Sequence, residues 1–447
     1  MNSSAELGHL KSEILKLSKR YFDLNQANSE FVPGKTYIPV TAKSMDANDL
    51  SHLVDSSLDM WLTAGRYARN FEASFSKFFN RTTKSLLVNS GSSANLVAIS
   101  ALGSPELKKM DREPLQRGDE IITLAAGFPT TVNPIIQNGW VPVFIDSDLE
   151  TINALPEKVY QAVSPKTKAV VLAHTLGNPF RSDLIAEFCK KNNLFLIEDC
   201  CDALGSTING TPVGSFGEYA TASFYPAHHI TMGEGGAVVS KDARYKKIAE
   251  SIRDWGRDCW CEPGVDNTCK KRFEWQLGDL PEGYDHKYIY SHIGYNLKVT
   301  DMQAALGVSQ LEKLPQFIAA RRANWKYLYE GIKQSPILSK NLIPVEPTPE
   351  TNPSWFGFPL FTQSSIDRTT LVRKLEKSRI GTRLLFAGNL TKQPAYKYAN
   401  YRIHGSLDNT NRIMNDLFWI GVHPLLNEAK MNYMLEKLES LVKELAK

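Results

Sequence analysis

The chain has 447 residues, of which 42% are hydrophobic and 22% charged, as is usual for a globular protein long enough to bury a large core. Its 52 Lys and Arg residues nearly balance 48 Asp and Glu residues and are dispersed, so we predict neither a nucleic-acid-binding nor a membrane-binding surface. No apolar run is long enough to span a bilayer and the N-terminus lacks a signal-peptide pattern, so we expect a cytoplasmic protein.

The N-terminal part begins with apolar residues at helical spacing. Leu10, Ile14, Leu17 and Tyr21 fall on one face of residues 8 to 28, which predicts a lone amphipathic helix. A proline-marked linker follows, and residues 46 to 80 are typical of two helices. We therefore divide the chain into an N-terminal helix and linker (1–45), a large domain (46–310) and a small C-terminal α+β domain (311–447).

The first strong boundary is a short buried strand that runs into a serine-rich turn. Leu86 to Val88 lead into Asn89-Ser90-Gly91-Ser92-Ser93, and a helix begins near Asn95. Small hydroxyl residues with a glycine at a helix start can place N–H groups around an anion, assisted by the helix dipole. Taken alone, however, the pattern favours an ordinary helix N-cap.

Apolar strands then alternate with helical patterns up to about residue 240. The strands are nearly continuous apolar runs, which predicts an α/β fold with a mostly parallel sheet covered on both faces. Ligands of such folds bind outside the carboxyl ends of the strands. The residues expected at that edge are Phe128, His174, Asn178, Asp199, Ser223 and His228.

Residues 219 to 240, YATASFYPAHHITMGEGGAVVS, form the most informative of these segments. A strand ends at Ser223, a loop holds His228 and His229, and glycines lead into the next strand. A polar, glycine-punctuated loop at the end of an apolar strand is where α/β enzymes keep their reacting groups.

Asp199 and Phe128 are candidate cofactor contacts. Asp199 ends the apolar strand LFLIED, where a carboxylate can hold a protonated pyridine nitrogen, and Phe128 can lie flat on such a ring. When each residue is considered alone, a helix N-cap is favoured for Asp199 and a core aromatic for Phe128.

The order of the motifs SGSSANL, AAGFPTTVNP, AHTLGNP, IEDCCDALGS, SFYPAHHITMGEGGA and GYNLKVTDMQAALG resembles the sugar-aminotransferase family of pyridoxal-phosphate enzymes across about residues 50 to 310. The resemblance implies fold type I, with a mostly parallel seven-stranded sheet. It also implies that Phe128 stacks on the cofactor ring, Asp199 pairs with the ring nitrogen and Asn178 lies near the ring hydroxyl. The implied phosphate ligands are Ser92, Ser93, Ser223 and, from the neighbouring subunit of a homodimer, Asn296.

The departures from this family are as informative as the matches. His228 stands where the family has the lysine that binds the cofactor covalently, and Asp202, Tyr225 and Phe356 also replace typical residues. Because imidazole cannot make that covalent link, the resemblance implies untethered pyridoxamine 5′-phosphate. His228 remains able to act as a catalytic base with a pKa near the working pH.

The cysteines form a candidate metal site. Between Cys201 and Cys259 there are 57 residues, between Cys259 and Cys261 one, and between Cys261 and Cys269 seven. Four thiolates can hold a two-iron, two-sulfur cluster or zinc, and the spacing leaves both open. Buried, inert cysteines are a further alternative, above all for Cys189 and Cys200.

This spacing, with RDWGRDCWC, NPSWFGFP and GTRLLFAGNLTKQP, is similar to the nucleotide-sugar 3-dehydrases of the same family. That resemblance implies a 2Fe-2S cluster on Cys201, Cys259, Cys261 and Cys269, and a separate NADH-dependent flavin iron–sulfur reductase. It implies removal of the 3-hydroxyl from CDP-4-dehydro-6-deoxyglucose, or alternatively from a TDP-linked deoxysugar. Two competing hypotheses are an aminotransferase with a structural zinc site and a catalytically silent binding protein.

Overall fold

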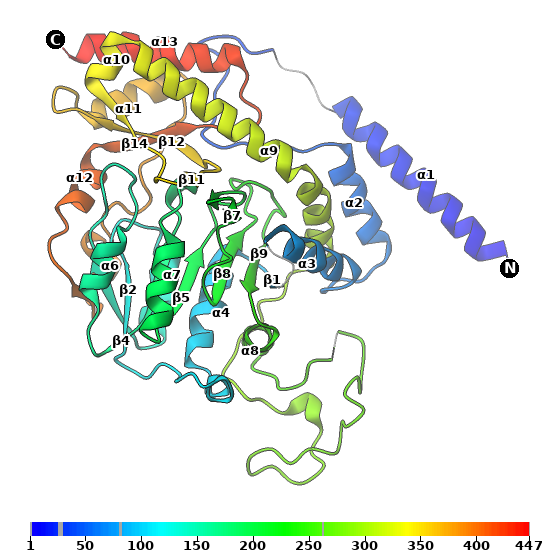
Figure 1. The fold of residues 1–447 in the computed structure, drawn as a ribbon. Coiled ribbons are helices and arrows are strands. Elements are labelled where there is room, and N and C mark those ends of the chain that lie inside the picture. The colour runs from blue at the N-terminus through cyan, green and yellow to red at the C-terminus, as the bar shows by residue number, and fades with distance from the viewer. Residues whose placement is uncertain (1, 26–29, 80–82, 262, 447) are drawn as a thin grey trace.

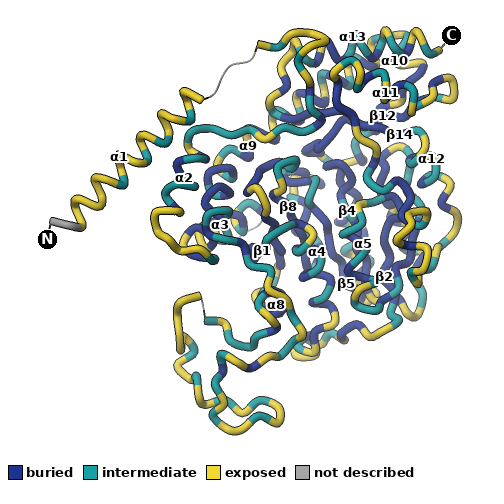
Figure 2. Tube along the Cα trace, turned by 180° about the vertical axis from the view of Figure 1, so that it is seen from behind, coloured by how far each residue is buried: buried dark blue, intermediate teal, exposed yellow. Residues whose placement is uncertain are grey.

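The computed structural model describes residues 2–25, 30–79, 83–261 and 263–446 (Figure 1). The body is a layered α/β structure around a large central sheet, and a second, smaller sheet lies near the C-terminal helix. One helix at the N-terminus and one loop-rich segment project from this body (Figures 1 and 2).

The central sheet has the strand order β1-β9-β8-β5-β4-β2-β3-β13. All neighbouring strands are parallel except β9, which is antiparallel to both β1 and β8. In sheet order the bounds are β1 (Lys84–Val88), β9 (Gly236–Ser240), β8 (Tyr219–Ser223), β5 (Phe195–Asp199), β4 (Thr167–Ala173), β2 (Glu120–Leu124), β3 (Val141–Ile145) and β13 (Arg402–Ile403).

The predicted α/β fold with a mostly parallel sheet is confirmed, and the seven expected strands are joined by an eighth. This strand, β13, comes from the C-terminal part of the chain and pairs with β3. The Arg402 guanidinium holds it in place by donating to both Glu120 carboxylate oxygens, at 3.0 and 2.7 Å. A two-residue strand has no hydrophobic period, so the sequence could not reveal it.

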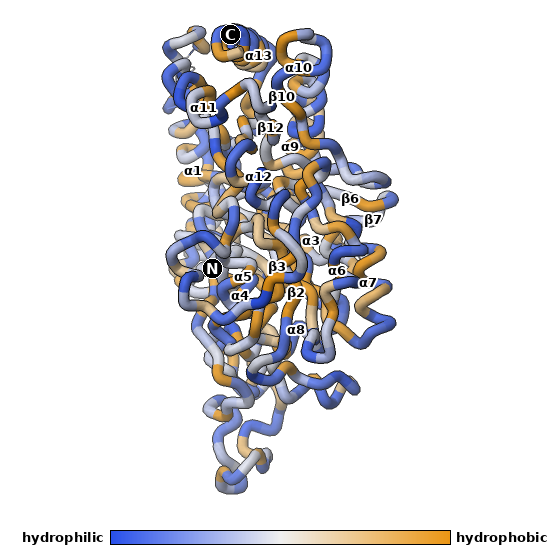
Figure 3. The backbone as a smooth tube through the Cα atoms, turned by 90° about the vertical axis from the view of Figure 1, so that its left-hand side faces the viewer, coloured by the Kyte–Doolittle hydropathy of each residue, from blue (hydrophilic) through white to orange (hydrophobic). Residues whose placement is uncertain are grey.

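Helices cover both faces of the central sheet because alternate side chains of each strand point to opposite faces. Leu86 and Val88 of β1 pack with α4, α5 and α8, whereas Leu87 packs with α3 and α9 on the other face. Helices α6 and α7 share the second face. Figure 3 shows the hydrophobic residues concentrated in the strands between these layers. The bounds are α3 (Arg66–Phe79), α4 (Gly91–Ser100), α5 (Pro129–Gln137), α6 (Pro156–Ala162), α7 (Ser182–Lys191), α8 (Ala243–Arg253) and α9 (Asp301–Gln334).

The smaller sheet is antiparallel, with the order β10-β12-β14, and has its own hydrophobic core. Trp325 and Leu328 of α9 belong to that core, so this one long helix packs against both sheets. The remaining elements are β10 (Leu342–Pro344), β12 (Gly357–Thr362), β14 (Leu417–Gly421), α10 (Pro336–Asn341), α11 (Arg368–Lys377), α12 (Asp408–Asp416) and α13 (Glu428–Leu445). A third, minor sheet joins β11 (Thr351–Asn352), β6 (Thr207–Ile208) and β7 (Thr211–Pro212).

The predicted N-terminal helix is present as α1 (Asn2–Asn25), which packs on α2 (Ala47–Leu58); residues 26–28 of the prediction lie outside the described residues. The face of α1 that packs on α2 is not the apolar face predicted from the sequence. Leu10, Ile14, Leu17 and Tyr21 are 40–66% exposed, whereas Leu15 and Phe22 are partly buried. The face on α2 is therefore a neighbouring stripe of the helix.

Residues 255–296, between α8 and α9, form a projecting arm (Figures 1 and 2). Among its described residues the only helical turn is the short one at His286–Tyr288. The root of the arm is fixed to β1, since the Arg253 guanidinium donates to the Leu87 carbonyl and the Asn89 N–H donates to the Leu297 carbonyl. None of the described helices has the length and apolarity needed to cross a membrane.

Candidate active site

A cavity of about 380 Å³ opens at the carboxyl edge of the central sheet. Loops after β1, β2, β4, β5 and β8 form its walls, as the parallel topology requires. Phe356 and Phe386, from the C-terminal part of the chain, complete the lining. The cavity therefore lies where the central sheet meets the region of the smaller sheet.

The structure brings most of the predicted site residues to this cavity. The predicted residues that line it are Ser92, Phe128, Asp199, Ser223, His228 and Cys201. Ser93, Asn178 and Asn296 are not among the lining residues. The contacts that keep each of them out of the cavity differ.

At one end of the cavity, helix α4 begins beside the end of β8. Ser90 is the N-cap, and its hydroxyl accepts the Ser93 N–H at 3.0 Å and donates to the Ser93 hydroxyl. A Cβ on Gly91 would lie 2.4 Å from the Ser223 Cβ. Only glycine therefore lets the start of α4 approach the end of β8 this closely. The N-cap and the anion site predicted from this segment are compatible, because Ser93 is engaged in the cap while Ser92 and Ser223 face the cavity.

Asp199 lies in the floor of the cavity and is 5% exposed. The Thr131 hydroxyl and the Asn95 amide donate to its Oδ2 at 2.7 and 2.8 Å, and the Cys201 N–H donates to Oδ1 at 3.1 Å. Thr221 in turn donates to Asn95 Oδ1. Neutral donors of this kind hold a carboxylate in one orientation while leaving its charge uncompensated. No helix begins here, so the N-cap interpretation is wrong for Asp199.

Phe128 forms part of the wall and is 49% exposed. The Phe386 ring packs edge-on against it, with ring centres 5.8 Å apart and planes at 86°. Such an edge contact fixes the ring without covering its whole surface. The interpretation as an ordinary core aromatic is therefore wrong for Phe128.

Asn178 does not contribute to the cavity, and the prediction that it lies near a cofactor hydroxyl has no support in its contacts. Its side chain is fully buried and donates to the carbonyls of Thr151 and Glu346, while its Oδ1 accepts the Thr348 N–H. With these bonds made, the amide joins the β3–α6 connection to the segment after β10. Asn178 is a structural residue here.

His228 projects into the cavity from the loop after β8. Its Nδ1 lies 3.3 Å from Asp202 Oδ1, and its ring packs against Phe356 with centres 5.2 Å apart. Burial raises the pKa of Asp202, although the contact with His228 opposes this shift. A carboxylate on Nδ1 favours the tautomer with the proton on that nitrogen, so Nε2 is free to accept a proton in the cavity.

The neighbouring His229 has the opposite environment. It is 3% exposed, and its Nε2 lies 2.9 Å from the Ser354 carbonyl oxygen. Burial lowers the pKa of His229 well below its usual range, so this imidazole stays neutral. Of the two adjacent histidines, His228 is the one available for chemistry.

Sequence reasoning missed the three residues that position the predicted ones. Asn95 and Thr131 orient Asp199, and Asp202 orients His228. A signal for Asp202 existed, because it departs from the typical family residue together with His228. The donors to Asp199 had no such signal, since they lie 68 and 104 residues away in sequence.

Asn296 lies at the root of the arm, where its backbone forms a bridge with Asp254. It does not line the cavity of its own chain. Its predicted contact with the phosphate of a neighbouring subunit stays a prediction.

The predicted metal ligands are divided between two places. Cys201 lines the cavity, whereas Cys259, Cys261 and Cys269 lie on the arm around a small cleft with His286. Among the described residues, no group of three or more His, Cys, Asp or Glu side chains is arranged to hold a metal ion. The four-cysteine cluster therefore stays a prediction. Cys189 and Cys200 are buried in the core, as expected of inert cysteines.

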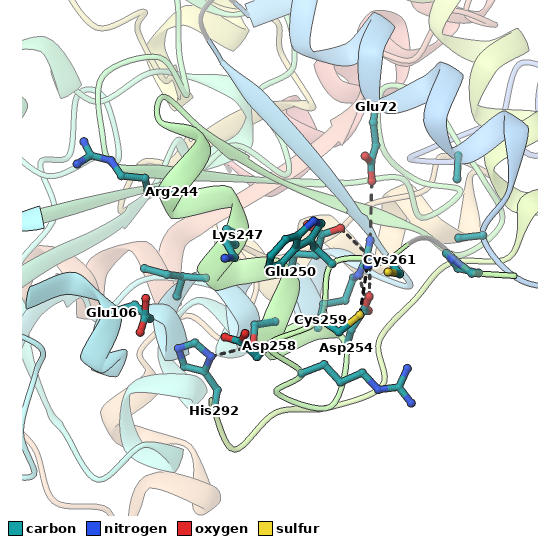
Figure 4. A pocket seen from close by; sticks show the side chains of 18 of the residues that line it. Glu72, Glu106, Arg244, Lys247, Glu250, Asp254, Asp258, Cys259, Cys261 and His292 are labelled. Atoms are coloured by element: carbon teal, nitrogen blue, oxygen red, sulfur yellow. Dashed lines mark hydrogen bonds and ion pairs between the residues drawn. The ribbon is translucent and has the colours of Figure 1, made fainter. Parts of the chain in front are cut away.

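A second cavity, of about 350 Å³, lies at the root of the arm (Figure 4). Cys259 and Cys261 lie beside charged groups that come from α3, α8 and the arm itself, including Glu72, Lys247 and Asp254. This cavity is separate from the one that contains Asp199 and His228.

The central sheet, the helix start at Gly91 and the polar loops at the carboxyl edge define the fold type I architecture of pyridoxal-phosphate enzymes. The chain belongs to the DegT/DnrJ/EryC1/StrS aminotransferase family, whose pattern matches residues 43–439.

Two sequence relatives match nearly the whole chain. It is 50% identical to the lipopolysaccharide biosynthesis protein RfbH of Salmonella typhimurium, over 96% of this chain and 98% of the relative. It is 51% identical to the dTDP-4-dehydro-2,6-dideoxy-D-glucose 3-dehydratase of Saccharopolyspora spinosa, over 95% and 91%. Among solved structures it resembles the E. coli GDP-4-keto-6-deoxy-D-mannose-3-dehydratase with bound hydrated PLP, with a TM-score of 0.79 and 29% identity over 90% of this chain and all of that chain.

Proposed function

We propose that this protein is a nucleotide-sugar 3-dehydratase that works with pyridoxamine 5′-phosphate held without a covalent bond. The observation that carries the proposal is the composition of the cavity. His228 projects into it, and none of the described residues that line it is a lysine. The side chain that would tether the aldehyde form of the cofactor is missing, while a base with an oriented imidazole is present.

The cavity residues fit such a cofactor at both ends. Gly91 and Ser92 at the start of α4, with Ser223 at the end of β8, supply N–H and hydroxyl donors for a phosphate group. Asp199 presents the uncompensated carboxylate that a protonated pyridine nitrogen requires, and Phe128 offers its ring for stacking. When bound, the cofactor would supply an amine for the sugar ketone and a ring that accepts electron density.

His228 has the role of the base in this proposal. Asp202 lies 3.3 Å from Nδ1 and its negative charge favours a proton on that nitrogen, so Nε2 would accept the proton that leaves the carbon next to the cofactor amine. The protonated His228 can then give this proton to the 3-hydroxyl group of the sugar, which leaves as water. Phe356 packs against the ring and restricts its orientation.

The substrate we propose is CDP-4-dehydro-6-deoxyglucose, in the biosynthesis of a 3,6-dideoxyhexose. Two relatives with 50% and 51% sequence identity support this class of substrate. One is named as a lipopolysaccharide biosynthesis protein, and the other is named as a 3-dehydratase of a dTDP-linked deoxysugar. Incubating the enzyme with CDP-, dTDP- and GDP-linked 4-keto-6-deoxy sugars in parallel would decide the nucleotide. A dTDP substrate turned over at least tenfold faster would replace the CDP assignment.

Three further features belong to the same proposal. Cys201, Cys259, Cys261 and Cys269 hold a 2Fe-2S cluster, which would provide one-electron transfer. An NADH-dependent flavin iron–sulfur reductase supplies the electrons, and the enzyme works as a homodimer. Their support is the cysteine spacing and the resemblance to nucleotide-sugar 3-dehydrases. Iron and sulfide analysis with a visible spectrum tests the cluster, and zinc in place of iron would favour an aminotransferase with a structural zinc site.

The decisive experiment replaces His228 by Asn. This variant should lose dehydration by about 10²-fold or more, because the proton acceptor is gone, while cofactor retained after gel filtration stays close to wild type. The control is His9→Asn, a change on the exposed helix α1 that should alter neither quantity. Native turnover by the His228→Asn enzyme would exclude His228 as the base.

A further inference from the structure

The four cysteines of the proposed cluster are separated by the fold. Cys201 follows β5, and its N–H is bonded to Asp199 in the cofactor cavity. The other three cysteines lie on the projecting arm, where Cys259 and Cys261 also line the second cavity. Within the described part of one chain, no three potential ligands converge as a metal site.

The arm cysteines are nevertheless arranged as a group. The Cys261 N–H points to Cys259 Sγ at 3.5 Å, and the Thr268 N–H points to Cys261 Sγ at 3.4 Å. Together with Cys269 they line one small cleft. Backbone N–H groups aimed at sulfur stabilise thiolates, which are the form that binds metal. Three of the four predicted donors thus share one cleft of the arm, although their present arrangement does not form a metal site, and the fourth donor is not among the residues of that cleft.

The arm also has the surface of a segment that is covered by another protein. Ile293 is fully exposed, and Phe273, Tyr288 and Tyr290 are each more than half exposed. Exposed apolar residues gathered in one segment mark an interaction site. Because the missing thiol lies in the body of the same chain, the partner that completes both the surface and the donor set is a second copy of this chain.

We infer that the cluster is formed between two subunits: Cys259, Cys261 and Cys269 of one arm join the partner subunit's Cys201. A homodimer then has two equivalent clusters, each next to the cofactor cavity of the subunit that gives Cys201. This inference rests on the proposed cluster and adds its position. An intersubunit cluster accounts for the length of the arm, because the arm must extend from its own subunit to reach the cavity of the partner subunit.

The test uses hybrid dimers with two different affinity tags, purified in tandem after co-expression. In the first hybrid, one chain carries Cys201→Ser and the other carries Cys259→Ser. Across the interface, the intact Cys201 of one chain meets the intact arm of the other, so one cluster forms per dimer, with roughly two iron atoms. If each chain built its own cluster, this hybrid would contain none.

The second hybrid uses the same two substitutions, but here a cluster is expected only if each chain builds its own. One chain is wild type and the other carries both Cys201→Ser and Cys259→Ser. The intersubunit arrangement then has no complete donor set and no iron, whereas assembly within one chain would give one cluster. A hybrid of Cys259→Ser with Cys261→Ser is the matched control, and it should be free of iron in either arrangement.

Iron content and the paramagnetic signal of the reduced protein are the measurements, and neither depends on turnover. Retained cofactor and an unchanged circular dichroism spectrum show that each variant is folded. The reverse pattern of the two hybrids overturns the inference while leaving the proposed function intact. It is also overturned if the Cys201→Ser homodimer keeps its iron, which would point to His286 as the fourth ligand. Iron-free wild-type protein would instead remove the cluster from the proposed function itself.

Discussion

His228 and His229 are consecutive residues, yet only one of them is placed for chemistry. The side chain of His229 is directed into the core, where the Ser354 carbonyl and burial hold it neutral, whereas His228 meets Asp202 and Phe356 in the cavity. The difference arises from the loop after β8, which turns the His229 imidazole into the core and the His228 imidazole toward the cavity. At this scale, the charge on Asp202 controls the orientation of the base.

Replacing Asp202 by Asn should lower turnover while raising stability near neutral pH. The loss of an oriented Nδ1–H should reduce turnover by about 10²- to 10⁴-fold. Burial raises the pKa of Asp202 above its ordinary value of 3.8, so between these two pKa values the folded protein holds a proton that the unfolded chain has released. The free energy of unfolding therefore falls as pH rises through this window, and the substitution removes that fall.

The measurement is the thermal midpoint as a function of pH, alongside turnover. The midpoint of the Asp202→Asn protein should exceed that of wild type at pH 7 and approach it below pH 4. Asp279→Asn is a suitable control, because Asp279 is exposed. A wild-type midpoint equal to or above that of the variant at pH 7 would contradict the argument.

At the scale of elements, the active site depends on the close approach of α4 to the end of β8. Gly91 begins the helix and touches Ser223, and Gly236 of β9 lies against the Ser90 carbonyl. These contacts fix the N–H groups that would face the phosphate. They also explain why glycine, a poor helix former, occupies the first position of α4.

Substituting Ala for Gly91 should weaken cofactor binding by about tenfold or more and lower stability by roughly 1–3 kcal/mol. The added Cβ would lie 2.4 Å from the Ser223 Cβ, so α4 or β8 must move. Gly8→Ala is the matched control, since a Cβ at Gly8 in α1 meets no atom within 4 Å and Ala favours a helix. Cofactor titration followed by absorbance gives the first quantity and chemical denaturation the second. Unchanged affinity in Gly91→Ala would show that this contact does not shape the phosphate site.

At the scale of the whole molecule, α9 connects the two sheets, and Arg321 is its central contact. The buried guanidinium donates to the Trp355 and Phe356 carbonyls before β12 and to the His228 carbonyl after β8. Burial lowers the pKa of Arg321 to about 10, and the negative charge of Asp202 opposes that shift. One side chain thus holds both walls of the cavity in register.

Arg321→Met should destabilise the protein by about 3–5 kcal/mol, because it leaves the buried Trp355, Phe356 and His228 carbonyls without their donor. We expect an accompanying loss of turnover, since Phe356 no longer aligns His228. Arg322→Met provides the comparison, because Arg322 donates to the Pro353 and Asn352 carbonyls of the same segment but lies farther toward solvent. Chemical denaturation of both variants is the measurement, and equal, small losses would show that Arg321 does not join the two sheets.

The sequence alone determined those features that depend on local pattern. Continuous apolar strands predicted the mostly parallel sheet, and the polar residue at each strand end predicted the edge where Ser92, Phe128, Asp199, Ser223 and His228 meet. This worked because parallel topology brings all carboxyl ends to one edge, whatever the packing details.

Only the tertiary structure decided which neighbours these residues have. It showed that Asn178 joins two loops, that Asp202 and Asn95 orient the chemical groups, and that β13 completes the sheet. It also separated Cys201 from the cysteines of the arm. Such facts depend on contacts between residues tens to hundreds of positions apart, and no local period or spacing encodes them.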